Sequence, residues 1–457
     1  MFNLPVFREM SLWEAIIIAV AMVALMGYTM MSLEWIPHLS ILLAMIALII
    51  YGMVRGVKYD QLQQGMVASV SSGLGAIYLF SFIGLLVSAL MMSGAIPTLM
   101  YTGFALISGD YFYLSAFILS SVIGIAIGSS LTTCATVGVA FMAMASVFDA
   151  NPIVTAGMIV SGAFFGDKMS PLSDTTAIAA STVGIDLFEH IKNMAYTTIP
   201  AFLITAIAAL YILPSAGTTD LADVQVFREQ LLASGLVHNY AVIPFILLIV
   251  LAMLKVRAIP TMIITIFSAL VVTYLHSSPS LADLGTYFFK GFKLDGFEQV
   301  SRLVSRGGVE SMFFTQTLVI LALSLGGLLF ALGIIPSLLT GIKNFLTTAG
   351  RATFSVAATS VGVNVLIGEQ YLSILLSGET FKPVYEQLGL HQRNLARTLE
   401  DAGTVINPLV PWSVCGVFIA QTLNVPVLSY LPFAIFCYAS LILTLLFGFT
   451  GLTLSRK

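Results

Sequence analysis

Eight apolar stretches dominate this sequence, and each is long enough to cross a lipid bilayer as a helix. A membrane-spanning helix needs about 20 mostly apolar residues. The stretches of suitable length are 12–31, 37–54, 73–93, 191–213, 240–256, 258–276, 309–332 and 428–448. Charged residues make up 9% of the chain, whereas a typical soluble domain has about 25%. The chain is therefore predicted to be an all-α polytopic membrane protein, which excludes a soluble enzyme.

The rest of the composition narrows the function classes. The net charge is −3 and no stretch concentrates basic residues, so nucleic acid is not a predicted partner. Three cysteines and five histidines are scattered without the spacing of a metal site. The sequence has no phosphate-binding loop and no credible nucleophile–base pair. We expect neither an enzyme nor a cofactor.

Four further apolar stretches are interrupted by polar residues together with glycine or proline. These stretches are 111–148, 153–183, 352–388 and 400–424, with interruptions at 128–130, 166–171, 368–370, 400–403 and 407–411. Backbone broken in this way is tolerated at membrane depth only where it is buried in protein or lines a cavity. These four segments are therefore predicted to form the functional centre.

The two halves of the chain show the same order of features. GAIPTL at 94–99 recurs as GIIPSL at 333–338, and after each copy come an interrupted stretch, a broken helix and a final span. We predict two repeats, 1–213 and 240–457, joined by an extracytoplasmic loop at 214–239. If the first interrupted stretch of each repeat is a re-entrant hairpin, each repeat has about five spanning helices, and this odd number inverts the second repeat.

The distribution of basic residues sets the predicted orientation. With the N-terminus inside, 13 basic residues lie on the cytoplasmic side and five outside, while Lys168 stays within the membrane. Cytoplasmic loops carry the excess of Lys and Arg, so both termini are predicted to be cytoplasmic. Short turns such as 94–110 and 149–152, which contain no Lys or Arg, are predicted to be external.

Two carboxylates in the first broken helix are the leading candidates for binding a cation. A carboxylate within the bilayer costs roughly 2.5–3.5 kcal/mol on insertion scales and is functional by default. Asp167 and Asp174 flank Pro171, which breaks the helix and frees backbone carbonyls. Hydroxyl groups of this break and of the preceding hairpin complete an oxygen-rich sodium site: Ser170, Ser173, Thr175, Thr132 and Thr133. The plainer alternative is that Asp167 only pairs with Lys168 at a membrane boundary.

Lys168 itself has two interpretations. It either neutralises Asp167 or Asp174 when no cation is bound, or extends its amine to the cytoplasmic interface. Because few carboxylates lie in the membrane, sodium and protons are predicted to compete for one site, with Lys168 pairing with the empty carboxylate.

The hairpin tip of the second repeat carries a different group. Glu369 follows Gly368 at this tip, where burial favours the neutral form of a carboxyl group, so Glu369 is predicted to carry a proton. The alternative is that Glu369 only forms a hydrogen bond with the broken backbone.

The second broken helix adds further polar candidates. Asp401, also predicted to be linked to the proton, is expected to share one cavity with Thr404 and Asn407, whereas Glu400 is expected at the wet edge. Trp412 is either an interfacial tryptophan or part of the cavity lining.

Two motifs resemble those of a known transporter family. GDKMSPLSDTT at 166–176 and LEDAGTV at 399–405, followed by PLVPW at 408–412, are similar to the hallmarks of the NhaC-type sodium/proton antiporter family. The resemblance in length and spans covers nearly the whole chain. It implies a prokaryotic plasma-membrane antiporter that exchanges sodium for protons or, as in some members, couples sodium and protons to malate and lactate.

Sodium/proton antiport is the favoured function, and organic-acid exchange is the alternative. Lys168 is the only basic residue predicted within the membrane, which disfavours two carboxylate substrates bound together. A channel is disfavoured because repeated broken helices imply alternating access. The predicted partners are sodium, protons and the lipid bilayer, with small organic acids and a second copy of the chain as further candidates.

Overall fold

The computed structural model describes residues 5–106, 109–171, 173–211, 221–254, 256–341 and 347–456, which fold almost entirely into helices. The first part of the chain contains α1 (Leu12–Met31), α2 (Pro37–Val54), α3 (Tyr59–Ser72), α4 (Leu74–Met92), α5 (Ala95–Leu106), α6 (Phe112–Ile127), α7 (Ser130–Thr133), α8 (Val139–Val147), α9 (Pro152–Met169), α10 (Asp174–Val183), α11 (Leu187–Tyr211) and α12 (Leu221–Ala233). The second part contains α13 (Ile243–Met253), α14 (Ala258–His276), α15 (Leu281–Lys290), α16 (Glu298–Val304), α17 (Phe313–Ala331), α18 (Ile334–Gly341), α19 (Ala349–Ile367), α20 (Gln370–Gln387), α21 (Gln392–Leu399), α22 (Val414–Leu423), α23 (Val427–Tyr430) and α24 (Ile435–Thr450).

The lengths and apolar composition of these helices are those of a polytopic membrane protein. Among the described residues, six helices are long and apolar enough to span a bilayer, or up to nine if each of three sharply bent pairs forms one span. The predicted spans 12–31, 37–54 and 258–276 coincide with α1, α2 and α14. The prediction of an all-α membrane protein is therefore confirmed.

Two connections differ from the sequence-based expectation. Residues 94–110, predicted to be a short external turn, contain the helix α5, which follows α4 at an angle of 64°. Gly94 makes this bend with φ of 77°, a conformation that favours glycine. The predicted loop 214–239 begins outside the described residues, and its described part starts with the helix α12.

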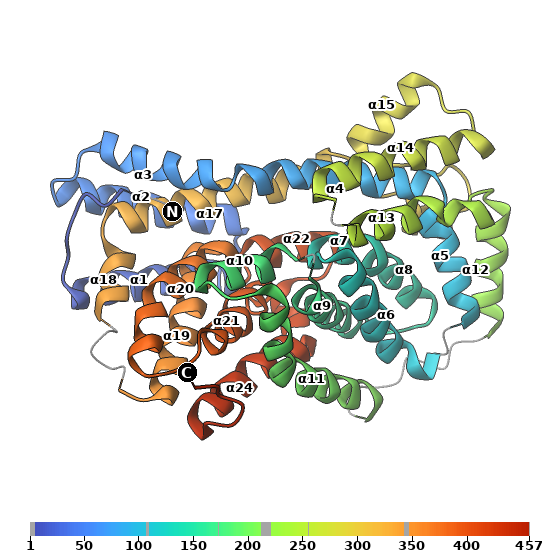
Figure 1. Ribbon diagram of the computed structural model, residues 1–457. Coiled ribbons are helices and arrows are strands. Elements are labelled where there is room, and N and C mark those ends of the chain that lie inside the picture. The colour runs from blue at the N-terminus through green and yellow to red at the C-terminus, as the bar shows by residue number, and fades with distance from the viewer. Residues whose placement is uncertain are drawn as a thin grey trace.

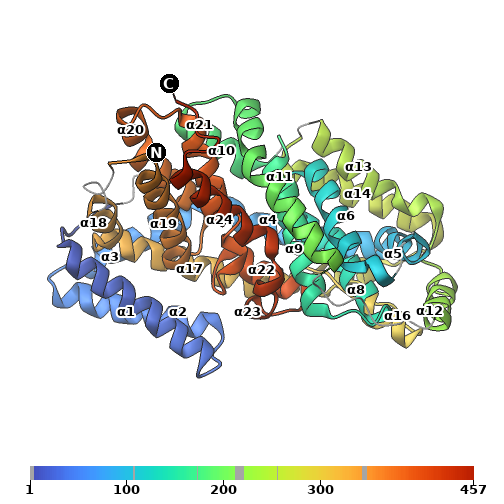
Figure 2. The same cartoon turned by 90° about the horizontal axis from the view of Figure 1, so that it is seen from below.

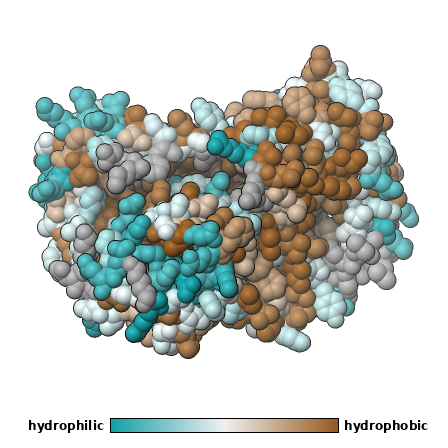
Figure 3. All heavy atoms as spheres, viewed as in Figure 1, coloured by the Kyte–Doolittle hydropathy of each residue, from teal (hydrophilic) through white to brown (hydrophobic). Residues whose placement is uncertain are grey.

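The helices surround a centre in which several of them are short or broken. Figure 1 shows α3 and α4 running nearly end to end along one side, where α3 packs on α17. Figure 2 shows α1 and α2 side by side at one end of the molecule and α12 at the other. Apolar side chains gather over the face formed by α6, α13 and α14 (Figure 3). Phe267 and Val271 of α14 are exposed apolar side chains, as expected for residues that face lipid.

Each half of the chain contains a helical hairpin. In the first, the rings of Phe112, at the start of α6, and Phe148, just after α8, lie 5.2 Å apart. In the second, the hydroxyl groups of Thr353 in α19 and Tyr385 in α20 lie 3.4 Å apart. In both cases the chain therefore returns to the level at which it started.

The two hairpin tips have the same backbone design. Gly128 ends α6 with φ of 71°, and Gly368 ends α19 with φ of 77°. Only glycine adopts this left-handed conformation without strain. The next residue caps the returning helix in each case, because Ser129 accepts the backbone N–H of the third residue beyond it, as does Glu369.

A broken helix follows each hairpin. α9 ends at Met169 and α10 begins at Asp174, whereas α21 continues through the π-helical turn Glu400–Thr404 and the 3₁₀ turn Asn407–Leu409 before α22 begins. Asp167 lies as far along the chain from Gly128 as Asn407 lies from Gly368. The two breaks thus hold an aspartate and an asparagine at corresponding positions.

Candidate cation site and the buried charges behind it

Asp167 is held at the point where the first broken helix meets the first hairpin tip. Its carboxylate accepts hydrogen bonds from Ser130, through the backbone N–H at 3.2 Å and the hydroxyl at 2.7 Å. Helices α6 and α9 approach closely here, since a Cβ on Gly166 would lie 2.5 Å from the Cα of Gly124. The glycine contact therefore brings a buried carboxylate against the tip of the hairpin.

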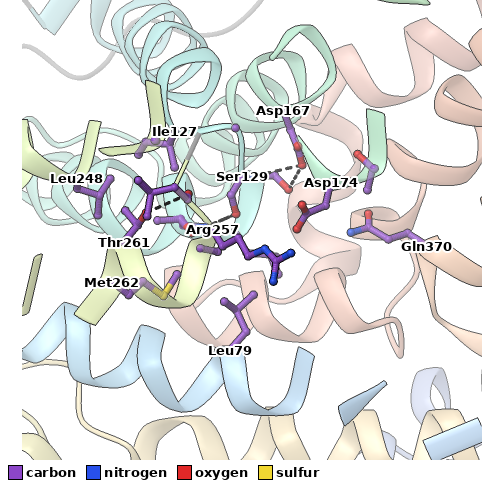
Figure 4. A pocket seen from close by; sticks show the side chains of 18 of the residues that line it. Leu79, Ile127, Ser129, Asp167, Asp174, Leu248, Arg257, Thr261, Met262 and Gln370 are labelled. Atoms are coloured by element: carbon purple, nitrogen blue, oxygen red, sulfur yellow. Dashed lines mark hydrogen bonds between the residues drawn. The ribbon is translucent and has the colours of Figure 1, made fainter. Parts of the chain in front are cut away.

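A cavity of about 210 Å³ opens beside this carboxylate. Figure 4 shows Asp167, Ser129 and Asp174 on one side of it and Gln370, from the second hairpin, on another. Thr132 and Thr175 also line this cavity. Two carboxylates and several hydroxyl groups form the oxygen-rich environment that a monovalent hard cation requires.

A second cavity, of about 870 Å³, adjoins the first. Asp174, Arg257, Gln370 and Tyr371 line both cavities, and Glu369 lines the larger one. Asp174 is exposed to this space, whereas Asp167 is only 4% exposed. A cation in the larger cavity would therefore meet Asp174 before Asp167.

Three of the predicted hydroxyl ligands do not line either cavity. The Ser170 hydroxyl donates to the carbonyl of Ile125 at 2.7 Å, and that of Thr133 donates to the carbonyl of Ser129 at 2.8 Å. Ser173 caps α10. Ser170 and Thr133 hold the backbone of the break and the tip, whereas the Ser173 hydroxyl also contacts the Asp167 carboxylate.

Lys168 forms an ion pair with Asp401, in which both side chains are completely buried. Thr197 on α11 contacts both partners, 3.4 Å from the lysine amine and 3.3 Å from the carboxylate. Both sequence-based interpretations of Lys168 are therefore wrong in this structure. Because Asp401 lies across from it, the amine turns neither to Asp167 or Asp174 nor to the cytoplasmic surface.

Glu400 also differs from expectation. It was predicted at the wet edge of the second broken helix, but its side chain is completely buried. The π-helical turn directs it inward, and neither of its carboxylate oxygens has a hydrogen-bond partner among the described residues. The Thr404 hydroxyl lies beside it without reaching hydrogen-bond geometry.

The second break is closed by side-chain amides rather than opened to a cavity. Asn407 donates to the Asn364 side chain at 2.9 Å and to the Gly368 carbonyl at 3.3 Å, and its own carbonyl accepts the Cys415 backbone N–H at 3.0 Å. Asn364 donates in turn to the carbonyl of Gly403 at 2.6 Å. None of Asp401, Thr404 and Asn407, which were predicted to share one cavity, lines either of these two cavities.

Two residues of the second repeat have structural roles that the sequence left open. Glu369 caps α20 by accepting the Leu372 backbone N–H at 2.7 Å, and it also faces the larger cavity. Trp412 is 8% exposed and donates to the Val365 carbonyl at 2.6 Å. The tryptophan is thus neither interfacial nor cavity-lining.

The sequence did not identify the part that α14 plays in the site. Arg257, which immediately precedes α14, reaches into the cavity toward Asp174 (Figure 4), and Thr261 one turn later lines the same wall. Arg257 is one of the 13 basic residues that the sequence analysis placed on the cytoplasmic side. Its position directly before an apolar span was the available signal, but spacing along the chain gives no indication that α14 reaches the first broken helix.

Comparisons with known proteins identify the family of the chain. The profile described as "Na+/H+ antiporter family" matches residues 162–452. The chain is 37% identical to the Na(+)/H(+) antiporter NhaC of Alkalihalophilus pseudofirmus, over 95% of both chains. It is also 37% identical to NhaC of Bacillus subtilis, over 90% of this chain and 92% of the relative.

A third relative is named for a different activity. The malate-2H(+)/Na(+)-lactate antiporter of Bacillus subtilis is 30% identical over 97% of this chain and 96% of its own. An ion-transporting membrane protein is the class that these findings define. The chain belongs to the Na+/H+ antiporter family, as the two sequence motifs predicted.

Proposed function

We propose that this protein is a secondary antiporter that exchanges sodium for protons, with Asp167 and Asp174 as the sodium site. The observation that carries the proposal is a pair of carboxylates on either side of a helix break, both lining one hydroxyl-lined cavity. The two NhaC relatives, each 37% identical over at least 90% of this chain, support the choice of sodium and protons.

The geometry assigns different tasks to the two aspartates. Asp174, exposed to the cavities, attracts the cation and removes part of its hydration shell. Asp167, anchored by Ser130, then supplies a fixed negative charge in a low-dielectric environment, where attraction to a cation is strong. Hydroxyl groups of Thr132 and Thr175 are available from the cavity wall.

Glu369 and Asp401 are proposed to be linked to the proton. Glu369 faces the larger cavity, where it can exchange a proton with water, while its bond to Leu372 fixes its position. Asp401 forms an ion pair with Lys168, and Lys168 directly follows Asp167 in the sequence. A change in charge at Asp167 is therefore felt at Asp401 through its partner.

The proposed transport cycle is alternating access between two inverted repeats, 1–213 and 240–457, with 214–239 outside and both termini in the cytoplasm. The matching hairpin tips and matching breaks support the repeat. The inversion follows from the odd number of crossings per repeat that the sequence predicts. The membrane is proposed to be a prokaryotic plasma membrane, because the resemblance to the sodium/proton antiporter family implies that location.

Labelling of introduced cysteines tests this topology. Glu229 in α12 and Gln387 at the end of α20 are both exposed, and the three native cysteines are buried. An impermeant thiol reagent added to intact cells should label Glu229→Cys and spare Gln387→Cys, which should react only after the membrane is opened. The reverse pattern would overturn the proposed inversion.

Exchange of small organic acids is the second candidate, and Arg257 is the observation that favours it. Its guanidinium group lines both cavities, so a carboxylate substrate could pair with it. The malate/lactate relative supports this candidate at lower identity than the NhaC relatives do.

Purified protein in proteoliposomes distinguishes the two candidates. For sodium/proton antiport, an outward sodium gradient alone should drive proton uptake that a pH-sensitive dye reports inside the vesicles. If protons move only when malate or lactate is also present, organic-acid exchange is the function. Protein-free vesicles and the exposed-site variant Asp60→Asn serve as controls.

A further inference from the structure

Glu400 is a buried carboxyl group that lines neither of the two cavities. It is completely buried, and neither carboxylate oxygen has a hydrogen-bond partner within the described ranges of the chain. An ionised carboxylate without partners is strongly disfavoured in a protein interior. Glu400 is therefore neutral in the arrangement that the structure describes, and its carboxyl group holds a proton.

Asp167 is one of the charged groups that act on Glu400. Asp167 and Glu400 directly precede the two partners of the buried Lys168–Asp401 ion pair, so both carboxyl groups belong to one buried cluster, in which the charge of Asp167 acts on Glu400. Two carboxylates in one buried cluster repel each other when both are ionised. The cation-binding aspartate and the buried glutamate are thus directly linked, although only the aspartate lines the cavity.

Other titratable groups surround the same cluster. The π-helical turn packs against α10, α19, α20, α21 and α24. Groups within electrostatic range come from these elements and from α9 and α11: Asp167, Lys168, Asp174, His190, Glu369, Tyr371, Tyr385, Arg397 and Cys437, while α19 carries only Arg351, in its first turn. Arg397 acts on Asp401, and His190, whose ring nitrogens have no partner among the described residues, faces the charge of Lys168.

Within the buried group formed by Asp167, Lys168, Arg397, Glu400 and Asp401, the charges do not balance unless one further cation is bound. Lys168 and Arg397 are positive, and Asp401 is negative in its ion pair with Lys168. If Asp167 and Glu400 were both ionised, the cluster would carry one excess negative charge. A single monovalent cation restores neutrality, whether it is sodium at Asp167 or a proton at Glu400.

We infer that Glu400 is the proton-binding site of the exchange, separate from the sodium site and linked to it by charge balance. The inference rests on the proposed sodium/proton antiport. When sodium binds Asp167, the O–H bond of the Glu400 carboxyl breaks, its electron pair stays on the carboxylate, and the proton passes to water. When sodium leaves, Glu400 takes a proton back.

This arrangement differs from the direct competition at one carboxylate that the sequence suggests. Asp167 never needs to hold the proton. When Glu400 is protonated and neutral, the positive charges of Lys168 and Arg397 already balance the negative charges of Asp167 and Asp401. Asp401 keeps its ion pair with Lys168 throughout, and neither Asp401 nor Glu369 at the larger cavity holds the exchanged proton.

Sodium-induced proton release from purified protein in weakly buffered detergent solution tests the inference. Wild type should release about one proton per sodium bound, and its sodium affinity should tighten by up to about tenfold per unit rise in pH. Glu400→Gln should bind radioactive sodium with the weaker affinity that wild type shows at low pH, with proton release reduced to near zero and no dependence of that affinity on pH. The exposed-site control Glu379→Gln should release protons as wild type does.

The alternative outcomes are distinct. Full proton release by Glu400→Gln, alongside normal release by wild type, would overturn the inference and leave the antiport intact. Sodium binding by a folded Glu400→Gln protein that is as tight as that of wild type at alkaline pH would also overturn it, because Glu400 would then not oppose sodium at Asp167. If Glu400→Gln does not fold, Glu400→Asp decides: it should keep proton release while moving the pH at which release is half complete, and an unchanged midpoint contradicts the inference. A wild type without sodium-driven proton movement would refute the antiport itself.

Discussion

The two broken helices place different residues at corresponding distances from their hairpin tips. In the first, Asp167 receives two hydrogen bonds from Ser130 and lines a cavity. In the second, Asn407 has its amide bonded to Asn364, Gly368 and Cys415 and lines neither cavity. One break therefore presents an ionisable group to solvent space, and the other is closed by neutral hydrogen bonds.

This difference shows how one backbone design serves two purposes. A helix break frees backbone groups that need partners. A carboxylate at such a break can accept bonds and still attract a cation, whereas an amide both donates and accepts and so satisfies the break completely. We conclude that the first break is built to bind an ion and the second to hold the scaffold against which it binds.

Asp167→Asn and Asp174→Asn should have the largest effect on this contrast. Each removes a negative charge from the cavity while keeping the side-chain shape, so sodium-driven proton movement should fall by roughly 100-fold or more. Transport in proteoliposomes is the measurement, with Asp60→Asn at an exposed position as the matched control. Wild-type rates in either variant would remove that residue from the site.

Asn407→Ala should act on stability instead. The change leaves the Gly368 carbonyl, the Asn364 side chain and the Cys415 N–H without their described partner, at a cost on the order of 3 kcal/mol. Thermal unfolding in detergent should show a clear drop for this variant, while Asp167→Asn unfolds close to wild type. Equal losses of stability in the two variants would remove the proposed division of roles.

Ser130→Ala should weaken sodium binding moderately. The variant loses the hydroxyl bond to Asp167 but keeps the backbone N–H bond, so we expect about a tenfold lower affinity. A titration of transport rate against sodium concentration measures this change. Ser181→Ala, at an exposed serine of α10, provides a comparison that should leave the affinity unaltered.

Glu369→Gln should have the smallest effect. Glutamine can still accept the Leu372 N–H, so the cap and the fold should remain. The loss of a titratable group beside the larger cavity should shift the pH–activity profile by about one pH unit or less, with near-normal maximal rate. If the profile does not move, Glu369 is only a helix cap.

The sequence predicted much of this architecture because its signals are local. Apolar length gave α1, α2 and α14, and the glycine-broken stretches near Gly128 and Gly368 gave the hairpins. Asp167 and Asp174 could be recognised because a charge within an apolar stretch is costly wherever it occurs.

The partners of these charges could not be predicted in the same way. Lys168 and Asp401 lie far apart in the sequence, and nothing in their local spacing indicates that α9 and the π-helical turn meet. Arg257 resembles any basic residue that flanks a span. Glu400 was expected at a wet edge, whereas its side chain is completely buried at the start of the π-helical turn.

Equilibrium binding of radioactive sodium to the purified protein tests the central claim most directly. We predict saturable binding to wild type at alkaline pH, loss of that binding in Asp167→Asn, and retained binding in Asn407→Leu, provided that each variant elutes as a folded monodisperse species. Sodium binding that survives in Asp167→Asn but disappears in Asn407→Leu would contradict the account, because it would place the ion at the second break.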